Sequence, residues 1–73
     1  MTPAQCCAAR AVLEWSELKL ANRALVSILA VRGYEAGWPV IRQSTIDVIQ
    51  RTFEGAGVTF IEPKGHPPCI RLR

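Results

Sequence analysis

The chain has 73 residues, with nine Lys and Arg against six Asp and Glu, a formal charge of +3 and a hydrophobic fraction of 49%. This length has room for one small domain, which excludes a doubly wound nucleotide-binding sheet and a (β/α)₈ barrel, and the apolar content is too high for a disordered segment. The longest uncharged apolar run, residues 24–31, is too short to cross a bilayer. Residues 1–5 lack the basic and apolar regions of a signal peptide. We therefore expect a cytoplasmic domain that has no membrane segment.

The three cysteines agree with a reducing compartment. Their number is odd and Cys6 and Cys7 are adjacent, which does not suit a disulfide framework. An alternative is a metal site formed by Cys6, Cys7, His66 and Cys69. The chain lacks, however, the two Cys-x-x-Cys motifs that are typical of such sites. We expect Cys6 to be a small core residue, the other cysteines to lie near the surface, and no metal or other cofactor to bind.

The first predicted helix runs over about residues 3–14. Thr2 is suited to cap it, Pro3 to occupy its first position, and Gln5 to complete a capping box. Apolar residues then recur at helical spacing and predict one buried stripe. This stripe consists of Cys6, Ala9 and Leu13.

Two short helices are predicted next, over about residues 17–24 and 28–35. Ser16 and Ser27 are suited to cap them. Gly33 costs the second of these helices about 1 kcal/mol relative to Ala, and Gly37 can supply the left-handed residue that ends it. The side chains expected to face the core are Leu20, Ala21, Ala24, Val31 and Tyr34.

A fourth helix is predicted over about residues 45–55, and two alternating segments then predict a β-hairpin over about residues 58–73. Ser44 is suited to cap the fourth helix, and Gly57 follows its end. Its inner face is expected to carry Ile46, Ile49 and Phe53. The predicted fold is mainly α: a compact four-helix domain with a helix-turn-helix over residues 17–35 and a C-terminal β-hairpin.

The pattern in and around this helix-turn-helix resembles the Cro/CI-type regulators of phages and bacteria. The matching residues are Trp15 to Ala21, Ala24 to Ser27, Val31 and Tyr34 to Gly37. Residues 2–6, 56–58 and 70–73 also look like a bacterial subgroup of these small proteins, so the resemblance covers nearly the whole chain. It implies a lambda-repressor-like fold and sequence-specific binding to double-stranded DNA by a transcriptional regulator, such as a repressor, that acts as a homodimer.

The resemblance also implies roles for particular residues. The helix over 27–35 would enter the major groove, and in related phage repressors an arginine of the first helix pairs with the glutamate that ends this helix. Arg10 and Glu35 stand in those two places. The residues that would face the groove are Ser27, Ile28, Leu29 and Arg32, while Arg42 and Gln43 would hold the DNA backbone.

Several positions depart from the family pattern. Leu25 stands where the turn usually has glycine, and a left-handed leucine there would be strained by about 1–2 kcal/mol. Ile28 and Leu29 stand where base-reading residues are usually polar, so they could only pack on thymine methyls. Arg32 and Gly33 are the next positions expected to face outward. Glu17 replaces the usual Gln, and Leu18 replaces a residue that is commonly acidic.

These departures leave an alternative function open. The fold could serve as a protein-interaction module, such as an anti-activator, antitoxin or co-regulator, that binds another regulatory protein. The apolar surface that it would use consists of Leu18, Leu25, Ile28, Leu29 and Trp38.

Two further interpretations concern the C-terminal part of the chain. The strand that contains Val58 and Phe60 is expected either to cover the core or to pair at its edge with a second copy, and the small core slightly favours the dimer. An enzyme is not expected, because His66 lies in a Pro-rich turn without a nearby nucleophile.

Overall fold

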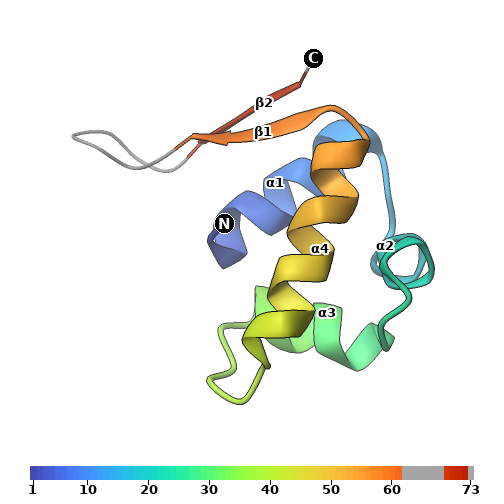
Figure 1. Cartoon of the computed structure of the whole chain (residues 1–73), viewed down its shortest axis with the longest axis vertical. Helices are drawn as coiled ribbons and strands as arrows, with labels where there is room; N and C mark the ends of the chain where they lie inside the picture. Colours follow the sequence, from blue (N-terminus) through green and yellow to red (C-terminus); the bar gives the residue numbers. More distant parts are fainter. Residues whose placement is uncertain (62–68, 73) are drawn as a thin grey trace.

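Four helices and a two-stranded hairpin follow one another along the chain (Figure 1). The computed structural model describes residues 1–61 and 69–72. The elements are α1 (Pro3–Leu13), α2 (Glu17–Ala24), α3 (Ile28–Glu35), α4 (Gln43–Gly55), β1 (Val58–Ile61) and β2 (Cys69–Leu72). This order confirms the mainly α fold with a C-terminal hairpin. The hairpin and α3 lie at opposite ends of the molecule (Figure 1). No helix within the described ranges has both the length and the hydropathy to cross a bilayer.

The capping box at the start of α1 is confirmed and does more than was expected. The Thr2 hydroxyl accepts a hydrogen bond from the Gln5 amide N–H at 3.1 Å, and the Gln5 side-chain oxygen accepts one from the Thr2 N–H at 2.8 Å. The Gln5 side-chain NH₂ group also donates to the backbone oxygen of Ile61 at 2.9 Å. One buried amide therefore caps α1 and ties its first turn to β1.

The core forms where the helices meet the base of the hairpin. Phe53 of α4 is fully buried, stacks on the ring of Trp15 at a centroid distance of 5.7 Å and meets the edge of Phe60 at 6.0 Å. The predicted inward residues are confirmed as core, except that Leu13 and Ile46 are only partly buried against it. The buried hydrophobic residues are Cys6, Ala9, Leu20, Ala21, Ala24, Val31, Tyr34, Ile49, Phe53 and Val58.

The hairpin pairs β1 with β2 in antiparallel register, from Val58 opposite Leu72 to Ile61 opposite Cys69. β1 packs on α4, whereas β2 packs on α1. The hairpin therefore covers the open end of the helical core. The turn that was predicted over residues 63–68 lies outside the described residues.

Helix α4 begins two residues earlier than predicted. Its N-cap is Arg42, whose backbone is extended and whose side chain makes no capping hydrogen bond. The prediction that Ser44 caps this helix is therefore wrong, because Ser44 already lies in the first turn. The side-chain NH₂ group of Gln43 donates to the Asp47 carboxylate at 3.0 Å, and such a pair four residues apart supports a helix that starts at Gln43.

Gly33 is buried in the structure, so the expectation that it faces outward is wrong. The indole of Trp38 and the side chain of Ile41 lie against it. A Cβ atom at position 33 would stand only 2.5 Å from Cε3 of Trp38. Glycine is therefore needed in the interior of α3 because the Trp38 ring packs directly on the helix backbone.

Leu25 ends α2 in the left-handed conformation, with φ 58° and ψ 41°, which confirms the left-handed backbone expected at this turn. The Leu25 N–H donates to the Asn22 oxygen at 3.4 Å and the Val26 N–H donates to the Ala21 oxygen at 3.0 Å, which closes the last turn of the helix. The side chain of Leu25 is 91% exposed. Leucine at this position therefore carries the conformational cost without a compensating burial of apolar surface.

Replacing Gly33 by Ala should lower the free energy of unfolding by about 1 kcal/mol, because the clash with Trp38 outweighs the gain in helix propensity. The same substitution in a Trp38→Ala background should instead be neutral or stabilising. Gly55→Ala is the matched control, since nothing lies within 4 Å of a Cβ at that helix end. Urea denaturation of the wild type, the three single variants and the double variant measures these effects, and a stabilised Gly33→Ala single variant would contradict the proposed packing.

Replacing Leu25 by Gly should raise the free energy of unfolding by up to about 1 kcal/mol, since glycine adopts positive φ without the Cβ penalty and little buried surface is lost. Glu14 ends α1 with the same φ of 58°, so Glu14→Gly should behave alike. Thermal unfolding followed by circular dichroism provides the measurement. A clear loss of stability in Leu25→Gly would mean that the leucine side chain packs elsewhere.

Candidate nucleic-acid interface

The joint between α2 and α3 is a three-residue turn over residues 25–27. The hydroxyl of Ser16 accepts from the Lys19 N–H at 3.0 Å, and that of Ser27 accepts from the Ala30 N–H at 3.1 Å. The Val26 N–H donates to the Ala21 oxygen at 3.0 Å. Both predicted caps are confirmed, and each end of the turn is held by hydrogen bonds within the chain.

One side of α3 packs on α2 and the rest of the core. The side chains at this contact are Leu20, Ala21, Ala24 and Val31, which are all buried. At the far end of α3, the Tyr34 hydroxyl donates to the backbone oxygen of Met1 at 2.8 Å, and burial raises the pKa of this phenol. The opposite side of α3 is left exposed at one end of the molecule (Figure 1).

The exposed side of α3 is largely apolar. Leu29 is 60% exposed, Arg32 is exposed, and the Trp38 ring, which is half exposed, lies over Gly33. We call Leu29, Arg32 and Trp38 the recognition face. Ile28 lies at its edge and is partly buried against the core.

The other residues predicted to contact DNA are exposed, but some of their polar groups have partners. The Ser27 hydroxyl caps α3, and Gln43 donates to Asp47. Arg42 is exposed at the start of α4. Arg32 lies 3.6 Å from the Glu17 carboxylate, so Leu29 and Arg42 are the predicted contacts with the most freely presented side chains.

Exposed basic residues outnumber acidic ones in the segment that contains the recognition face. Residues 17–46 contain four basic side chains, Lys19, Arg23, Arg32 and Arg42, all of them exposed, and two acidic ones, Glu17 and Glu35. Each of the two carboxylates lies beside an arginine. Glu17 lies 3.6 Å from Arg32, and Glu35 lies 2.7 Å from Arg10.

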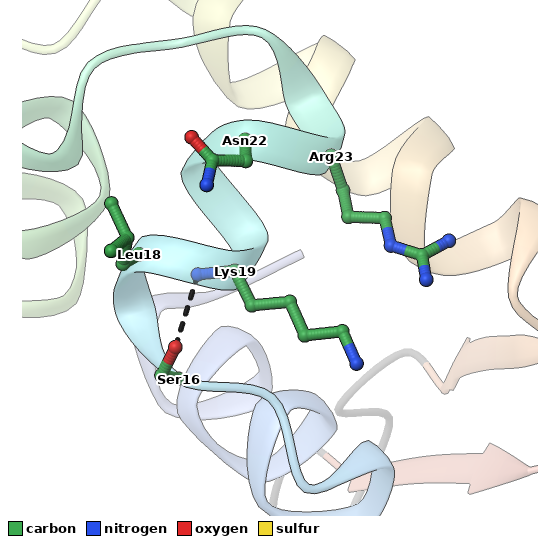
Figure 2. Close-up of a pocket in the computed structure, with 5 residues that line it drawn as sticks. All are labelled: Ser16, Leu18, Lys19, Asn22 and Arg23. Atoms are coloured by element: carbon green, nitrogen blue, oxygen red, sulfur yellow. Dashed lines mark hydrogen bonds between the residues drawn. The ribbon is translucent and has the colours of Figure 1, made fainter.

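The outer side of α2 has two kinds of surface (Figure 2). Lys19 and Arg23 extend to one side, and the guanidinium of Arg23 lies 5.3 Å from the ring centroid of Trp15. Leu18, which is 55% exposed, points the other way. A shallow hollow on this side is lined by Ser16, Leu18, Lys19, Asn22 and Arg23.

The expected pair between Arg10 and Glu35 is present. Nε and Nη2 of Arg10 donate to the two carboxylate oxygens of Glu35 at 2.7 and 2.8 Å, and Nη1 donates to the backbone oxygen of Trp15 at 3.0 Å. The two side chains are only 18% and 11% exposed. This two-bonded pair fixes the end of α3 against α1 and against the start of α2.

The thiol of Cys6 joins this pair, which the sequence did not indicate. It donates to Oε2 of Glu35 at 3.3 Å. Burial, with the nearby Glu35 carboxylate, raises the pKa of the Cys6 thiol well above its usual value. The hydrogen bonds to Glu35 likewise raise the pKa of Arg10. Cys6 is therefore held as a protonated thiol, which is unreactive as a nucleophile, whereas Cys7 is exposed.

The strand residues that were expected at a dimer contact contribute to their own core. Val58 is 2% exposed, and Phe60 is partly buried against Phe53. The backbone oxygen of Ile61 already accepts from Gln5. The side chain of Val58 is therefore not available to a second copy, and pairing through the strand edge stays a prediction.

Of the four residues considered for a metal site, Cys6 points at Glu35, Cys7 is exposed, Cys69 begins β2 and His66 lies outside the described residues. In the part of the chain that the structure describes, no three His, Cys, Asp or Glu side chains gather in a way that could hold a metal ion.

Comparison with known proteins does not assign the chain to a family. It matches no protein-family model, and no curated protein is significantly similar to it in sequence. The candidate interface therefore depends on its own geometry and charges.

Breaking the Arg10–Glu35 pair from either side should lower the free energy of unfolding by about 3 kcal/mol, because the remaining charge is left poorly solvated. Arg10→Met, Glu35→Gln and the double variant form a double-mutant cycle, in which the losses should be clearly non-additive. The exposed pair of Glu17 and Arg32 is the control, with an expected coupling below about 1 kcal/mol. Additive losses for Arg10 and Glu35 would show that the contact has no energetic role.

Proposed function

We propose that this chain is a DNA-binding domain, in which α3 enters the major groove and α2 lies across the sugar-phosphate backbone. The observation that carries the proposal is the geometry of α2 and α3: a three-residue turn joins them, one side of α3 is buried, and its other side is exposed among basic residues. A helix held in this way can enter a groove that is about 12 Å wide without disturbing the core.

The basic residues have positions that suit phosphate contacts. Arg32 lies on α3 itself, and Arg42 precedes the first turn of α4. An arginine near a helix N-terminus is well placed to share a phosphate with the free backbone N–H groups there. Each phosphate contact of this kind should contribute about 0.9 to the salt dependence of binding.

The wider role follows from the same proposal. We infer a cytoplasmic transcriptional regulator that binds DNA as a homodimer, because a charge of +3 is light for one monomer and suits one half of a symmetric complex. Two copies would place their α3 helices in successive major grooves, one helical turn or about 34 Å apart.

One observation favours a second candidate function. Leu18 of α2 and Leu25, which ends this helix, are both strongly exposed. Neither belongs to the recognition face. Exposed apolar residues of this kind are typical of a contact with another protein, which would make the domain a protein-interaction module.

Titration with mixed-sequence duplex DNA at low and high salt separates the two functions. For a DNA-binding domain we expect binding at low salt that weakens steadily as salt is added, and selection from random duplexes should enrich two-fold symmetric sites. No binding at low salt would reject the proposal in favour of the protein-interaction module.

Replacing Arg32 or Arg42 by Ala should weaken DNA binding and reduce the salt slope by about one unit for each arginine. Arg71→Ala is the matched control: it removes the same charge from β2, at the opposite end of the molecule (Figure 1). Fluorescence anisotropy with a labelled duplex at several salt concentrations gives the slopes. Equal slopes for all three variants would mean that the α3 end of the domain does not contact the phosphates.

A further inference from the structure

The recognition face differs from an ordinary base-reading surface in its chemistry. Ile28 and Leu29, at the start of α3, have no group that can donate or accept a hydrogen bond. Arg32 is the one charged side chain on this face. Position 33, one turn beyond Leu29, has no side chain at all, and the Trp38 ring occupies the space next to it.

Trp38 adds an aromatic ring next to position 33. Its ring is held against the backbone of α3, since there is no room for even a methyl group between them. Half of the side chain still faces solvent. The face therefore presents the Leu29 side chain, the Arg32 cation and the exposed half of an aromatic ring.

The major groove has one apolar feature that matches such a surface. Thymine carries a methyl group at C5, which projects into the groove, and apolar side chains contact it. A methyl group at C5 of cytosine projects from the equivalent position of the pyrimidine ring. We propose that α3 recognises C5-methylated pyrimidines, either thymine or 5-methylcytosine, through Leu29 and Trp38; this inference rests on the proposed DNA-binding function.

The charges favour DNA over a protein as the occupant of this face. Arg32 lies on this face and Arg42 is exposed just before α4, and both nearby carboxylates lie beside arginines. A groove whose floor carries methyl groups and whose rims carry phosphates complements a surface that combines apolar side chains with these arginines. A second copy of the chain would instead bring like charges together.

Matched duplexes test the inference. Each duplex has about 20 base pairs, enough for two half-sites one turn apart. One A·T-rich sequence is made with thymine or with deoxyuridine, and one G·C-rich sequence is made with cytosine or with 5-methylcytosine. We expect anisotropy titrations at low salt to show binding that is tighter by about fourfold for each contacted methyl, the factor that corresponds to burial of one methyl-sized group.

Substitutions on the recognition face test whether its side chains cause the preference for methylated duplexes. Leu29→Ala and Trp38→Ala should each reduce the preference for methylated duplexes while leaving the salt slope unchanged. Leu18→Ala removes the same atoms as Leu29→Ala from a side chain of similar exposure on α2, and it should keep the full preference. Circular dichroism of each variant shows whether it is folded.

The outcomes distinguish the two levels of the proposal. Equal affinity for the methylated and unmethylated duplexes, with normal salt dependence, overturns the methyl recognition and leaves DNA binding intact. Absence of binding to every duplex overturns both. A preference for thymine alone, or for 5-methylcytosine alone, supports the inference and identifies the base that the domain reads.

Discussion

The position of α3 depends on one buried ion pair. Arg10 reaches from α1 to hold both carboxylate oxygens of Glu35, and its remaining nitrogen holds the backbone of Trp15 just before α2 begins. Three helices therefore meet at a single guanidinium. Because an arginine fork bonds a carboxylate in one plane, it restricts the rotation of α3 about its axis as well as its distance from α1. The direction in which Leu29 and Arg32 project follows from this restriction.

The other end of α3 is held by shape rather than by charge. Gly33 allows the Trp38 ring to lie on the helix backbone, and Ile41 closes the same contact. A core this small buries few large side chains, so a half-exposed tryptophan contributes a large share of the apolar contact at this end. The same ring forms part of the recognition face. Stability and surface chemistry are therefore coupled at Gly33, and a side chain there would alter both.

Local sequence signals were enough to predict most of the fold. The capping residues Thr2, Ser16 and Ser27 mark helix starts because their hydroxyls satisfy free N–H groups within three residues. The start of α4 was missed because it depends on a side-chain pair, Gln43 with Asp47, rather than on a cap. The ion pair of Arg10 with Glu35 came from a family resemblance, since no local pattern connects residues 25 positions apart.

The contacts of Gly33 and Cys6 could not be predicted in the same way. A glycine inside a helical pattern indicates only a loss of propensity, and nothing local shows that a ring five residues later will cover it. The contact between Cys6 and Glu35 arises only after α1 and α3 have packed together. Both features belong to tertiary structure, which is also where the recognition face acquires its shape.

An apolar recognition face sets a limit on specificity. A bidentate hydrogen-bonded pair discriminates between bases by about 1–3 kcal/mol, whereas one methyl contact contributes about 0.8 kcal/mol. Two or three methyl contacts per subunit therefore contribute roughly as much discrimination free energy as one bidentate hydrogen-bonded contact with a base. Adequate selectivity over a genome therefore requires that both subunits of a dimer contact methyl groups at once. The affinity ratios between preferred and other sites that the two subunits contribute then multiply. In a single subunit the surrounding cations would dominate, and binding would follow the phosphates more closely than the bases.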